Sequence, residues 1–568
     1  MSYLPELIDI RSKKEILNKF AGLNMTPAIK DAEFCKMLNM TSDQYPALSP
    51  RAPRHFVRRI SKPNGLFMHD RLAWVDGTSF YYDGHIAGSV SDCKKTLIGM
   101  GAYIVIFPDK LLFNTKTQTF ENMENKTVTQ NISCTLTDDT GEGYTYTSSF
   151  EAPLSPADGS YWLDTSKTPH VLKQYSQIQQ EWAAVDTVCV KISGTGIGLG
   201  FNKLDTVSIS GMPLDELNGD FSLQACADDY IVITGVISEA GTENGSVTVE
   251  RKVPDMDFVT ESGNRIWGCS SFQHEIYASK QGDAKNWYSY LGIASDSYAS
   301  TIGTKGDFTG ASTHMGYVTF FKEDVIQRVY GSKPANYQIN DTYARGVEKG
   351  SERSVAMINE TLFYKSMNDI CCMSGGLPQG ISKELGNAAR KNAVGGTLGK
   401  KYYLSMQEED GSFGLYVFDS ELGFWHKEDD THVLFFAGSG GELYFSDDKG
   451  GLWNINGDTS YDSEEACSEG PVSWYCITGS IGMDSPDSKY VSKLRFRLEA
   501  DNSSTLKIEA SYDGGDFKTV YSLRPGKKRS VTVPIVPRRC DTMRLKISGR
   551  GSCRIYSITK SVEPGSDA

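Results

Sequence analysis

The sequence lacks several features that would place it quickly in a functional class. Its 12 cysteines never form a C-x-x-C pair and its eight histidines are dispersed, so no metal-ligand spacing appears. The only adjacent cysteines are Cys371 and Cys372, and neighbouring cysteines rarely bridge. We therefore expect the cysteines to be small buried residues of a protein made in a reducing cytoplasm. We predict neither a metal nor a cofactor.

Long apolar runs and a basic surface are also missing. No segment approaches the roughly 18 apolar residues that a membrane-spanning helix needs, so no such segment is expected. The N-terminal stretch has no continuous apolar core followed by a cleavage site, which argues against a signal peptide. The chain has 58 Lys and Arg and 71 Asp and Glu, so its net charge is −13. Stable binding to a nucleic-acid backbone is therefore not expected.

Turn and strand residues, in contrast, are abundant. The 568 residues include 55 glycines and 29 tyrosines, a mixture typical of short strands joined by tight turns. Hairpin-like segments recur at intervals of 51, 45, 40 and 41 residues, measured between Ile266, Tyr317, Leu362, Tyr402 and Leu443. A repeat of about 40–50 residues with four strands is the period of a β-propeller blade. The clearest repeat covers 400–437, with the candidate strands KYYLSM, GLYVFD, GFWHKE and VLFFA.

Changes in this pattern predict the domain organisation. The repeat stops between about 119 and 258, and after 460 it gives way to alternating strands such as SKLRFRLEA. We predict an all-β chain made of an N-terminal extended arm (1–60), a six- or seven-bladed β-propeller (61–118 and 259–460), an inserted small β domain (119–258) and a C-terminal antiparallel β-sandwich of jelly-roll type (461–568). The stretch VLKQYSQIQQEWAAV in the inserted domain is expected to be one helix or one long strand.

The stretch YFSDDKGGLWNI matches the Asp-box pattern S-x-D-x-G-x-x-W, with Ser446, Asp448, Gly450 and Trp453 in its four positions. We expect the first three to fix a hairpin turn by hydrogen bonds from side chain to backbone, and Trp453 to pack in the blade. Asp boxes occur on the outer rim of sialidase-like propellers, away from the central site. The motif therefore predicts a fold and not catalysis.

Other segments could carry chemistry. A glycosidase needs two carboxylates about 5–10 Å apart, and a sialidase needs an arginine cluster and typically an F/Y-R-I-P motif, which is absent. WHKEDDTH (425–432) could hold a metal, but we expect a solvated turn with Trp425 packed inward and the charges outward. GTGIGLG (194–200) lacks the Gly-Lys-Ser/Thr of a phosphate loop and is expected to be a β turn. No catalytic residue is predicted, and no enzyme is expected.

Three basic segments could meet nucleic acid. They are SPRAPRHFVRR (49–59), RPGKKR (524–529) and PRRCDTMR (537–544). We favour contact with an acidic neighbouring subunit instead.

Several sequence segments, taken together, carry a resemblance to a known family. Among them are SDQYPALSPR, GDAKNWYSYLGIASDSY, RGVEKGSERSVAMINETLFYKS and PRRCDTMRLKISGRGSCRIYSITK. They resemble a family of virion structural proteins encoded by phages and prophages of gut Gram-positive bacteria, and the resemblance runs nearly end to end. The predicted layout is also similar to the tail hub, or nozzle, of short-tailed phages. Those subunits form six-fold rings below the portal and the adaptor, and the DNA leaves through them.

The resemblance implies a structural protein of the phage tail or head–tail junction, made in the host bacterial cytoplasm. Its subunits would form a homo-oligomeric ring, expected to be a hexamer, that contacts the portal, the adaptor and other tail proteins. Phage DNA would pass through this ring during ejection without sequence-specific binding. The alternative is a receptor- or glycan-binding tail protein that uses its C-terminal sandwich. Exposure of aromatics such as Trp474, Tyr475 and Tyr512 on one sandwich face would support it, and their burial in the core would not. A third hypothesis is a sialidase-like glycan hydrolase, which would need a pocket of Arg, Glu and Tyr on the propeller axis.

Overall fold

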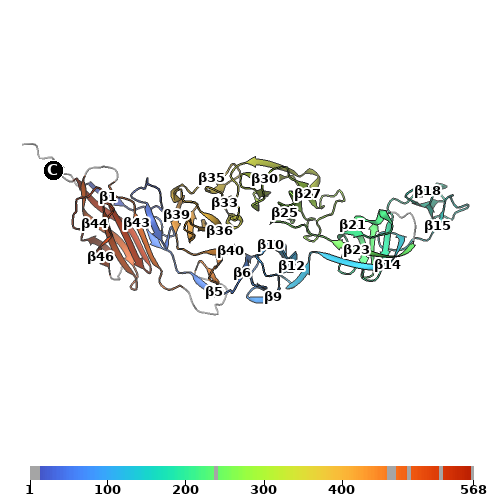
Figure 1. Cartoon of the computed structure of the whole chain (residues 1–568), viewed down its shortest axis with the longest axis horizontal. Helices are drawn as coiled ribbons and strands as arrows, with labels where there is room; N and C mark the ends of the chain where they lie inside the picture. Colours follow the sequence, from blue (N-terminus) through green and yellow to red (C-terminus); the bar gives the residue numbers. More distant parts are fainter. Residues whose placement is uncertain are drawn as a thin grey trace, which may run out of the picture. The chain divides into compact units, whose positions relative to one another are not determined.

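The computed structural model of the chain is built almost entirely from β-strands (Figure 1). It describes residues 13–235, 241–439, 441–456, 469–482, 488–523 and 529–564. The chain divides into two compact units: Met1–Lys94, Phe321–Ile326 and Thr342–Ala568 form the first, and Lys95–Phe320 and Gln327–Asp341 form the second. Within the described ranges no helix is long and apolar enough to cross a membrane. The helical turns are η1 (Asp215–Leu217), η2 (Pro334–Asn336), η3 (Glu352–Ser354) and η4 (Lys383–Leu385).

Seven four-stranded antiparallel sheets in the described residues have the up-and-down strand order of a propeller blade. The sheets are β6 (Pro63–Met68), β7 (Leu72–Asp76), β8 (Ser79–Tyr82), β9 (His85–Ser89); β10 (Thr96–Met100), β11 (Tyr103–Phe107), β12 (Leu111–Asn114), β13 (Thr119–Asn122); β24 (Phe258–Glu261), β25 (Ile266–Ser270), β26 (Glu275–Ala278), β27 (Tyr298–Thr301); β28 (Gly310–His314), β29 (Tyr317–Phe321), β30 (Val325–Tyr330), β31 (Gln338–Tyr343); β32 (Ala356–Ile358), β33 (Thr361–Lys365), β34 (Ile370–Met373), β35 (Gln379–Gly380); β36 (Lys391–Leu398), β37 (Lys401–Gln407), β38 (Phe413–Asp419), β39 (Phe424–Lys427); and β40 (Val433–Ser439), β41 (Glu442–Asp447), β42 (Gly451–Asn454), β5 (His55–Arg59). The predicted all-β propeller fold is therefore confirmed, while the number of blades that close one propeller stays a prediction.

The sequence repeat marks the second strand of five of these sheets. Its equivalent points are the first or second residues of the strands β25, β29, β33, β37 and β41. The second strand lies inside its sheet and is the most apolar, which makes it the clearest signal in the sequence. The repeat placed at 400–437 is shifted by one strand, however, because its last strand, β40, begins the next sheet. The true first strand, β36, reads KNAVGGTL, and its glycines and polar residues hide it from a pattern search.

The C-terminal sandwich consists of two antiparallel sheets, with the orders β1-β49-β44-β47 and β2-β43-β48-β45-β46. In β44, Leu494, Phe496 and Leu498 are buried while the alternate basic residues are exposed, as the sequence predicted. The strands are β1 (Lys13–Leu17), β2 (Phe34–Leu38), β43 (Ser473–Thr478), β44 (Lys489–Ala500), β45 (Thr505–Tyr512), β46 (Lys518–Leu523), β47 (Arg529–Val533), β48 (Met543–Arg550) and β49 (Cys553–Pro564).

The N-terminal region differs from the extended arm that we expected over 1–60. Strand β1 pairs with β49, β2 pairs with β43, and β5 completes the sheet of β42, so the beginning of the chain lies inside the folded first unit. Figure 1 shows β1, in blue, among the red strands of the sandwich. Burial of Phe34 and Met37 in the shared core explains why this segment does not stay extended in solvent. Residues 1–12 of the expected arm lie outside the described residues.

The inserted domain lies in the second unit and contains a closed six-stranded barrel. A small four-stranded sheet is inserted in the sequence between the barrel strands β14 and β19. The barrel strands are β14 (Asn125–Thr137), β19 (Cys189–Ser193), β20 (Thr206–Ser210), β21 (Gly219–Ala227), β22 (Tyr230–Thr234) and β23 (Gly241–Arg251), and those of the small sheet are β15 (Tyr146–Ser149), β16 (Tyr161–Asp164), β17 (Val171–Ser176) and β18 (Glu181–Ala184). The stretch expected to be one helix or one long strand is the hairpin β17–β18, because Gln180 takes a positive φ of 55° and turns the chain.

Candidate functional site

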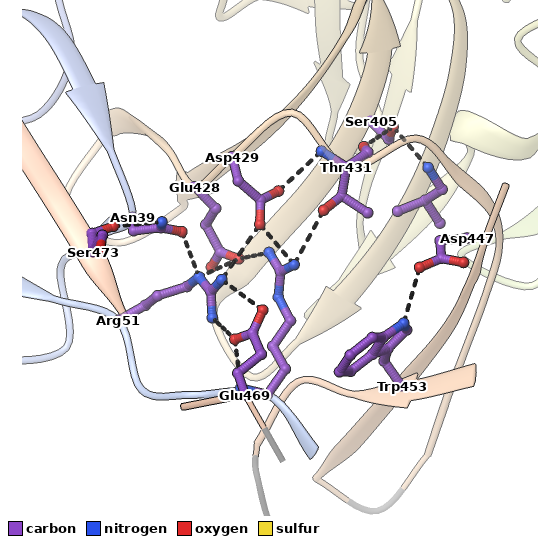
Figure 2. A network of polar contacts seen from close by, with 12 residues as sticks. Asn39, Arg51, Ser405, Glu428, Asp429, Thr431, Asp447, Trp453, Glu469 and Ser473 are labelled. Atoms are coloured by element: carbon purple, nitrogen blue, oxygen red, sulfur yellow. Dashed lines mark hydrogen bonds and ion pairs between the residues drawn. The ribbon is translucent and has the colours of Figure 1, made fainter. Parts of the chain in front are cut away.

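Two buried arginines meet three carboxylates in the first unit (Figure 2). Arg51 and Arg54 lie directly after β4 (Ser49–Pro50), on a proline-containing segment that forms no strand. The carboxylates are those of Glu428 and Asp429, just after β39, and of Glu469, just before β43. We call these five residues the arginine cluster. It joins three parts of the chain that are far apart in sequence.

The distances in the arginine cluster are those of strong, charge-assisted contacts. Arg51 Nη1 lies 2.5 Å from Glu469 Oε2 and Arg51 Nη2 lies 3.3 Å from Asp429 Oδ2. Arg54 Nη2 lies 2.6 Å from Glu428 Oε2, and Arg54 Nη1 lies 2.8 Å from Asp429 Oδ2. Each carboxylate is therefore held by at least one guanidinium.

The electrostatics of the cluster favour charged groups. Burial raises the pKa of Asp429, but the attraction of Arg54 and Arg51 and the hydrogen bond of Thr431 outweigh it and lower that pKa to about 2. Burial also opposes the charged form of Glu469, and Arg51 and Arg54 again bring its pKa below the usual value. A general acid at neutral pH needs a raised carboxyl pKa, so neither of these two groups fits that role. The arrangement instead holds three distant parts of the chain together.

The segment 425–432 therefore differs from the solvated turn that we predicted. Trp425 does pack inward and donates from Nε1 to the carbonyl of Ile381 at 2.7 Å. Glu428, however, is buried with Arg54 rather than turned outward. His426 is buried as well, and burial together with nearby Lys401 lowers its pKa to about 3, so the imidazole is neutral at physiological pH. The local sequence could not reveal this, because the arginines come from a segment more than 370 residues earlier.

The basic segment 49–59 also differs from our expectation. Its arginines 51 and 54 contact acidic groups of their own chain, and Arg58 lies over the rings of Trp74 and Tyr81 at 5.2 and 5.4 Å. Segment 537–544 remains at the surface, with Arg538, Arg539 and Arg544 exposed. Of the remaining basic segment, 524–529, residues 524–528 lie outside the described residues.

Two cavities of the first unit are lined in part by the segment 41–54 and by residues of the arginine cluster. The first has a volume of about 520 Å³ and is lined by segments 41–53, 469–472, 501–503 and 551–554. We call it the sandwich cavity, because the last two segments are loops and strand ends of the sandwich. The second, the blade cavity, has a volume of about 590 Å³ and is lined mainly by 398–403, Arg54, Glu428 and 455–456. Both volumes fall in the roughly 300–1,000 Å³ range of small-molecule sites.

Polar and apolar groups line the sandwich cavity in about equal measure. Its charged and hydrogen-bonding side chains are those of Thr41, Asp43, Gln44, Ser49, Arg51, Glu469, Asp501, Ser503, Ser552 and Arg554. Ser49 is only 3% exposed, and its hydroxyl has no hydrogen-bond partner among the residues that the structure describes. A buried polar atom without a partner lowers the stability of the fold.

The blade cavity gathers Arg54, Glu428 and Tyr403, the residue types of the glycosidase hypothesis. Glu428 is already paired with Arg54. Burial raises the pKa of Tyr403 well above its ordinary value, so its hydroxyl stays protonated. Glu428 is therefore paired and the Tyr403 hydroxyl is protonated, so neither offers a free nucleophile.

The exposed aromatic face that would support glycan binding by the sandwich does not form. Trp474 is buried in the core and donates from Nε1 to the carbonyl of Gly551 at 2.9 Å. Tyr475 and Tyr512 are partly exposed, but the Lys546 ammonium and the Arg538 guanidinium lie over their rings at 5.5 and 5.6 Å. A glycan site on the sandwich would therefore use its loops and not this face.

The Asp box holds a hairpin turn, but with a different carboxylate from the one predicted. Asp447 Oδ1 accepts from the backbone N–H of Lys449 and Gly451, at 3.0 and 2.6 Å, and its Oδ2 accepts from Trp453 Nε1 at 2.9 Å. Asp448 instead lies 3.2 Å from His432 Nδ1. Gly450 has a φ of +78°, which explains the glycine at that position. The hairpin turn was predicted correctly, but two roles were assigned wrongly: that of Asp448, and that of Ser446, whose buried hydroxyl has no partner among the described residues.

Across the described parts of the chain, no group of three His, Cys, Asp or Glu residues has the arrangement of a metal site. The eleven cysteines that the structure describes are free thiols.

Comparison with known proteins identifies no family. No protein-family model matches the chain, and no curated protein matches its sequence. Similar solved structures include the exo-beta-1,3-galactanase from Phanerochaete chrysosporium with galactose, at 10% identity and a TM-score of 0.21, covering 53% of this chain and 94% of that one. The phage phi92 endosialidase has 9% identity, a TM-score of 0.22 and coverage of 72% and 64%. The Trypanosoma rangeli sialidase in complex with sialic acid has 9% identity, a TM-score of 0.19 and 95% coverage of both chains.

These similarities require one correction. We predicted that the chain is not an enzyme, and this is contradicted because glycoside hydrolases are among the similar structures. We withdraw the exclusion. TM-scores near 0.2 give no argument about which glycan, if any, this chain binds or cleaves.

Proposed function

We propose that this chain is a virion protein that binds a short, polar oligosaccharide in the sandwich cavity. The observation that carries the proposal is the set of ten charged and hydrogen-bonding side chains among the residues that line this cavity. The proposal keeps the binding function expected of the C-terminal sandwich. It moves the site from the sheet face to the loops.

The lining suits sugar hydroxyl groups, which both donate and accept hydrogen bonds. Asp43 and Asp501 supply acceptors, and Arg554 and Ser503 supply donors. Burial opposes the charged form of Asp43, but the Lys401 ammonium at 2.5 Å lowers its pKa overall, so this carboxylate accepts at neutral pH. The arginine cluster fixes the wall formed by 51–54, which limits the ordering that binding would require.

The test is binding of the purified full-length chain to an array of neutral and acidic glycans, followed by calorimetry on any glycan that is retained. Asp501→Asn and Arg554→Gln remove one acceptor and one donor from the cavity. We expect each to weaken binding about tenfold, because one charge-assisted hydrogen bond contributes on the order of 1.4 kcal/mol or more. Release of reducing ends from the bound glycan is measured in the same samples, and such release would add hydrolysis to binding.

Arg497→Gln is the matched control, because Arg497 is exposed on the neighbouring strand β44 and does not line the cavity. It should leave binding unchanged. A chain that retains no glycan, or one whose binding is indifferent to Asp501 and Arg554, would rule the proposal out.

The ring of a tail hub or nozzle stays a prediction from the family resemblance. It concerns assembly rather than the sandwich cavity, so both functions can belong to one virion protein. A ring would require complementary patches on each copy.

A further inference from the structure

The loop 289–297 of the second unit presents apolar side chains to solvent. It connects β26 with β27 and contains Tyr290, Leu291 and Ile293, which are 55%, 53% and 50% exposed. All three lie within four residues of one another in the chain, so this loop exposes several apolar side chains close together in sequence. We call it the apolar loop. Large apolar side chains gathered at one exposed place mark interaction sites more often than scattered single residues do.

The apolar loop is held in one conformation. The N–H of Ser297 donates to the carbonyl of Ser289 at 2.9 Å, which closes the loop at its base. The buried Asp296 accepts from the N–H of Ile293 at 3.0 Å and from the hydroxyl of Ser289 at 3.2 Å. The buried guanidinium of Arg265 donates to the carbonyls of Ala294, Ser295 and Asp296. A rigid loop loses little entropy when a partner covers it, as expected of a binding element.

The surroundings of the apolar loop are acidic. Burial, the neighbouring Tyr288 and the carboxylates of Asp220 and Glu275 together raise the pKa of Tyr290 to about 12. Lys110 also faces Tyr288, but Glu124 and Asp255 bind its ammonium group, each at 2.7 Å. An acidic rim would be repelled by an anionic lipid surface and attracted by a basic protein surface.

A complementary surface exists on the first unit of the same chain. The segment 534–539, PIVPRR, joins β47 to the sheet residues that follow and belongs to no sheet. Its Val536 is 81% exposed, and the exposed Arg538, Arg539 and Arg544 lie beside it in sequence. Prolines 534 and 537 restrict the backbone, and Arg538 is positioned over the ring of Tyr512. We call residues 534–539 the basic segment from here on; it is distinct from the segment 49–59 described above.

We propose that the apolar loop of one copy docks on the basic segment of a second copy. Tyr290, Leu291 and Ile293 would cover Val536, while Asp220 and Glu275 would face the arginines. The two surfaces are different, so the contact is head-to-tail, and each copy keeps one unused surface of each kind for a further neighbour. The partner is a second copy because the same chain carries both an exposed apolar loop with acidic neighbours and the exposed Val536 with basic neighbours.

The first measurement is sedimentation velocity of the full-length chain over a range of concentrations. A photo-crosslinking phenylalanine analogue at position 290 identifies what the loop touches. We expect concentration-dependent association that weakens at high salt, and a crosslink from position 290 to residues 534–544 of another copy. A chain that stays monomeric at the highest soluble concentration, or a crosslink to a different region, overturns the proposal.

Two double variants test the direction of the contact. One is Leu291→Asp with Ile293→Asp, and the other is Arg538→Glu with Arg539→Glu. Each alone should lose association at least tenfold, while an equal mixture of the two should form dimers and nothing larger, because one intact pair of surfaces remains. Association unchanged in either variant, or a mixture that stays monomeric, contradicts a head-to-tail contact.

The control is Phe272→Asp, a change at an 88% exposed residue in the β25–β26 turn of the same sheet as the loop. It changes an apolar surface residue to the same carboxylate without touching the loop. It should leave association as in the unchanged chain. An equal loss in this control would show that added negative charge, and not the loop, weakens association, and would overturn the proposal. All variants are compared by thermal unfolding, so that a misfolded chain is not mistaken for one that fails to associate.

Discussion

The guanidinium of Arg51 donates to the Glu469 carboxylate at 2.5 Å although 418 residues separate the two in the chain. The same arginine donates from Nε to the side-chain carbonyl of Asn39 at 2.8 Å, and Asn39 in turn donates to the carbonyl of Ser473 (Figure 2). The N-terminal segment is thus bound to the beginning of the sandwich at several points. Together with the pairing of β5 and β42, these contacts make the chain's beginning and its last third one cooperative structure.

The arginine cluster should be sensitive to the loss of one charge. Glu428→Gln preserves the shape of the side chain but leaves the buried Arg54 with Asp429 as its remaining acidic contact. We expect the free energy of unfolding of the first unit to fall by about 3 kcal/mol, as for other broken buried ion pairs. Denaturant unfolding followed by tryptophan fluorescence measures this. Lys62→Met breaks the exposed Lys62–Asp92 pair and should cost less than about 1 kcal/mol. Similar losses in both variants would contradict the importance of burial.

Acid should weaken the same cluster over a defined pH range. The pKa of Asp429 is about 2 in the folded chain, below its ordinary value of 3.8, so the folded state binds this proton less readily than the unfolded state. Its contribution is fully present above pH about 4 and is lost as the pH falls toward 2, amounting to about 2 kcal/mol. The measurement is denaturant unfolding at several pH values. Asp429→Asn should be less stable at pH 7, and the difference from the unchanged chain should shrink between pH 4 and pH 2. A difference that stays constant over that range would argue against the shifted carboxyl group.

The Asp-box hairpin allows a direct comparison of two adjacent aspartates. Asp447→Ala removes the acceptor for two backbone N–H groups and for Trp453 Nε1, so we expect a loss of about 2 kcal/mol. Asp448→Ala removes only the partly exposed contact with His432 and should change stability by less than about 0.5 kcal/mol. Thermal unfolding and hydrogen exchange of residues 447–453 compare the two. Equal losses, or a larger loss for Asp448, would return the role to the position that the sequence motif indicates.

The sequence by itself determined the strand content, the blade repeat and the alternation of the sandwich strands. These properties are local: burial of alternate or consecutive side chains leaves a period in the chain, as Leu494, Phe496 and Leu498 show. The same locality explains the errors. Strand β36 was missed because its glycines give no apolar signal, and the hairpin β17–β18 was read as one element because the turn between its strands contains no glycine or proline.

Only the tertiary structure decided where the N-terminal segment lies and what its arginines do. The sequence around Arg51 and Arg54 does not indicate Glu428, Asp429 or Glu469 as their partners. The pairing depends on tertiary contacts between segments that are hundreds of residues apart. The sandwich cavity arises in the same way, because its walls come from four separate segments of the first unit. Local patterns encode strands and turns, whereas a site assembled from distant loops exists only once the strands have packed.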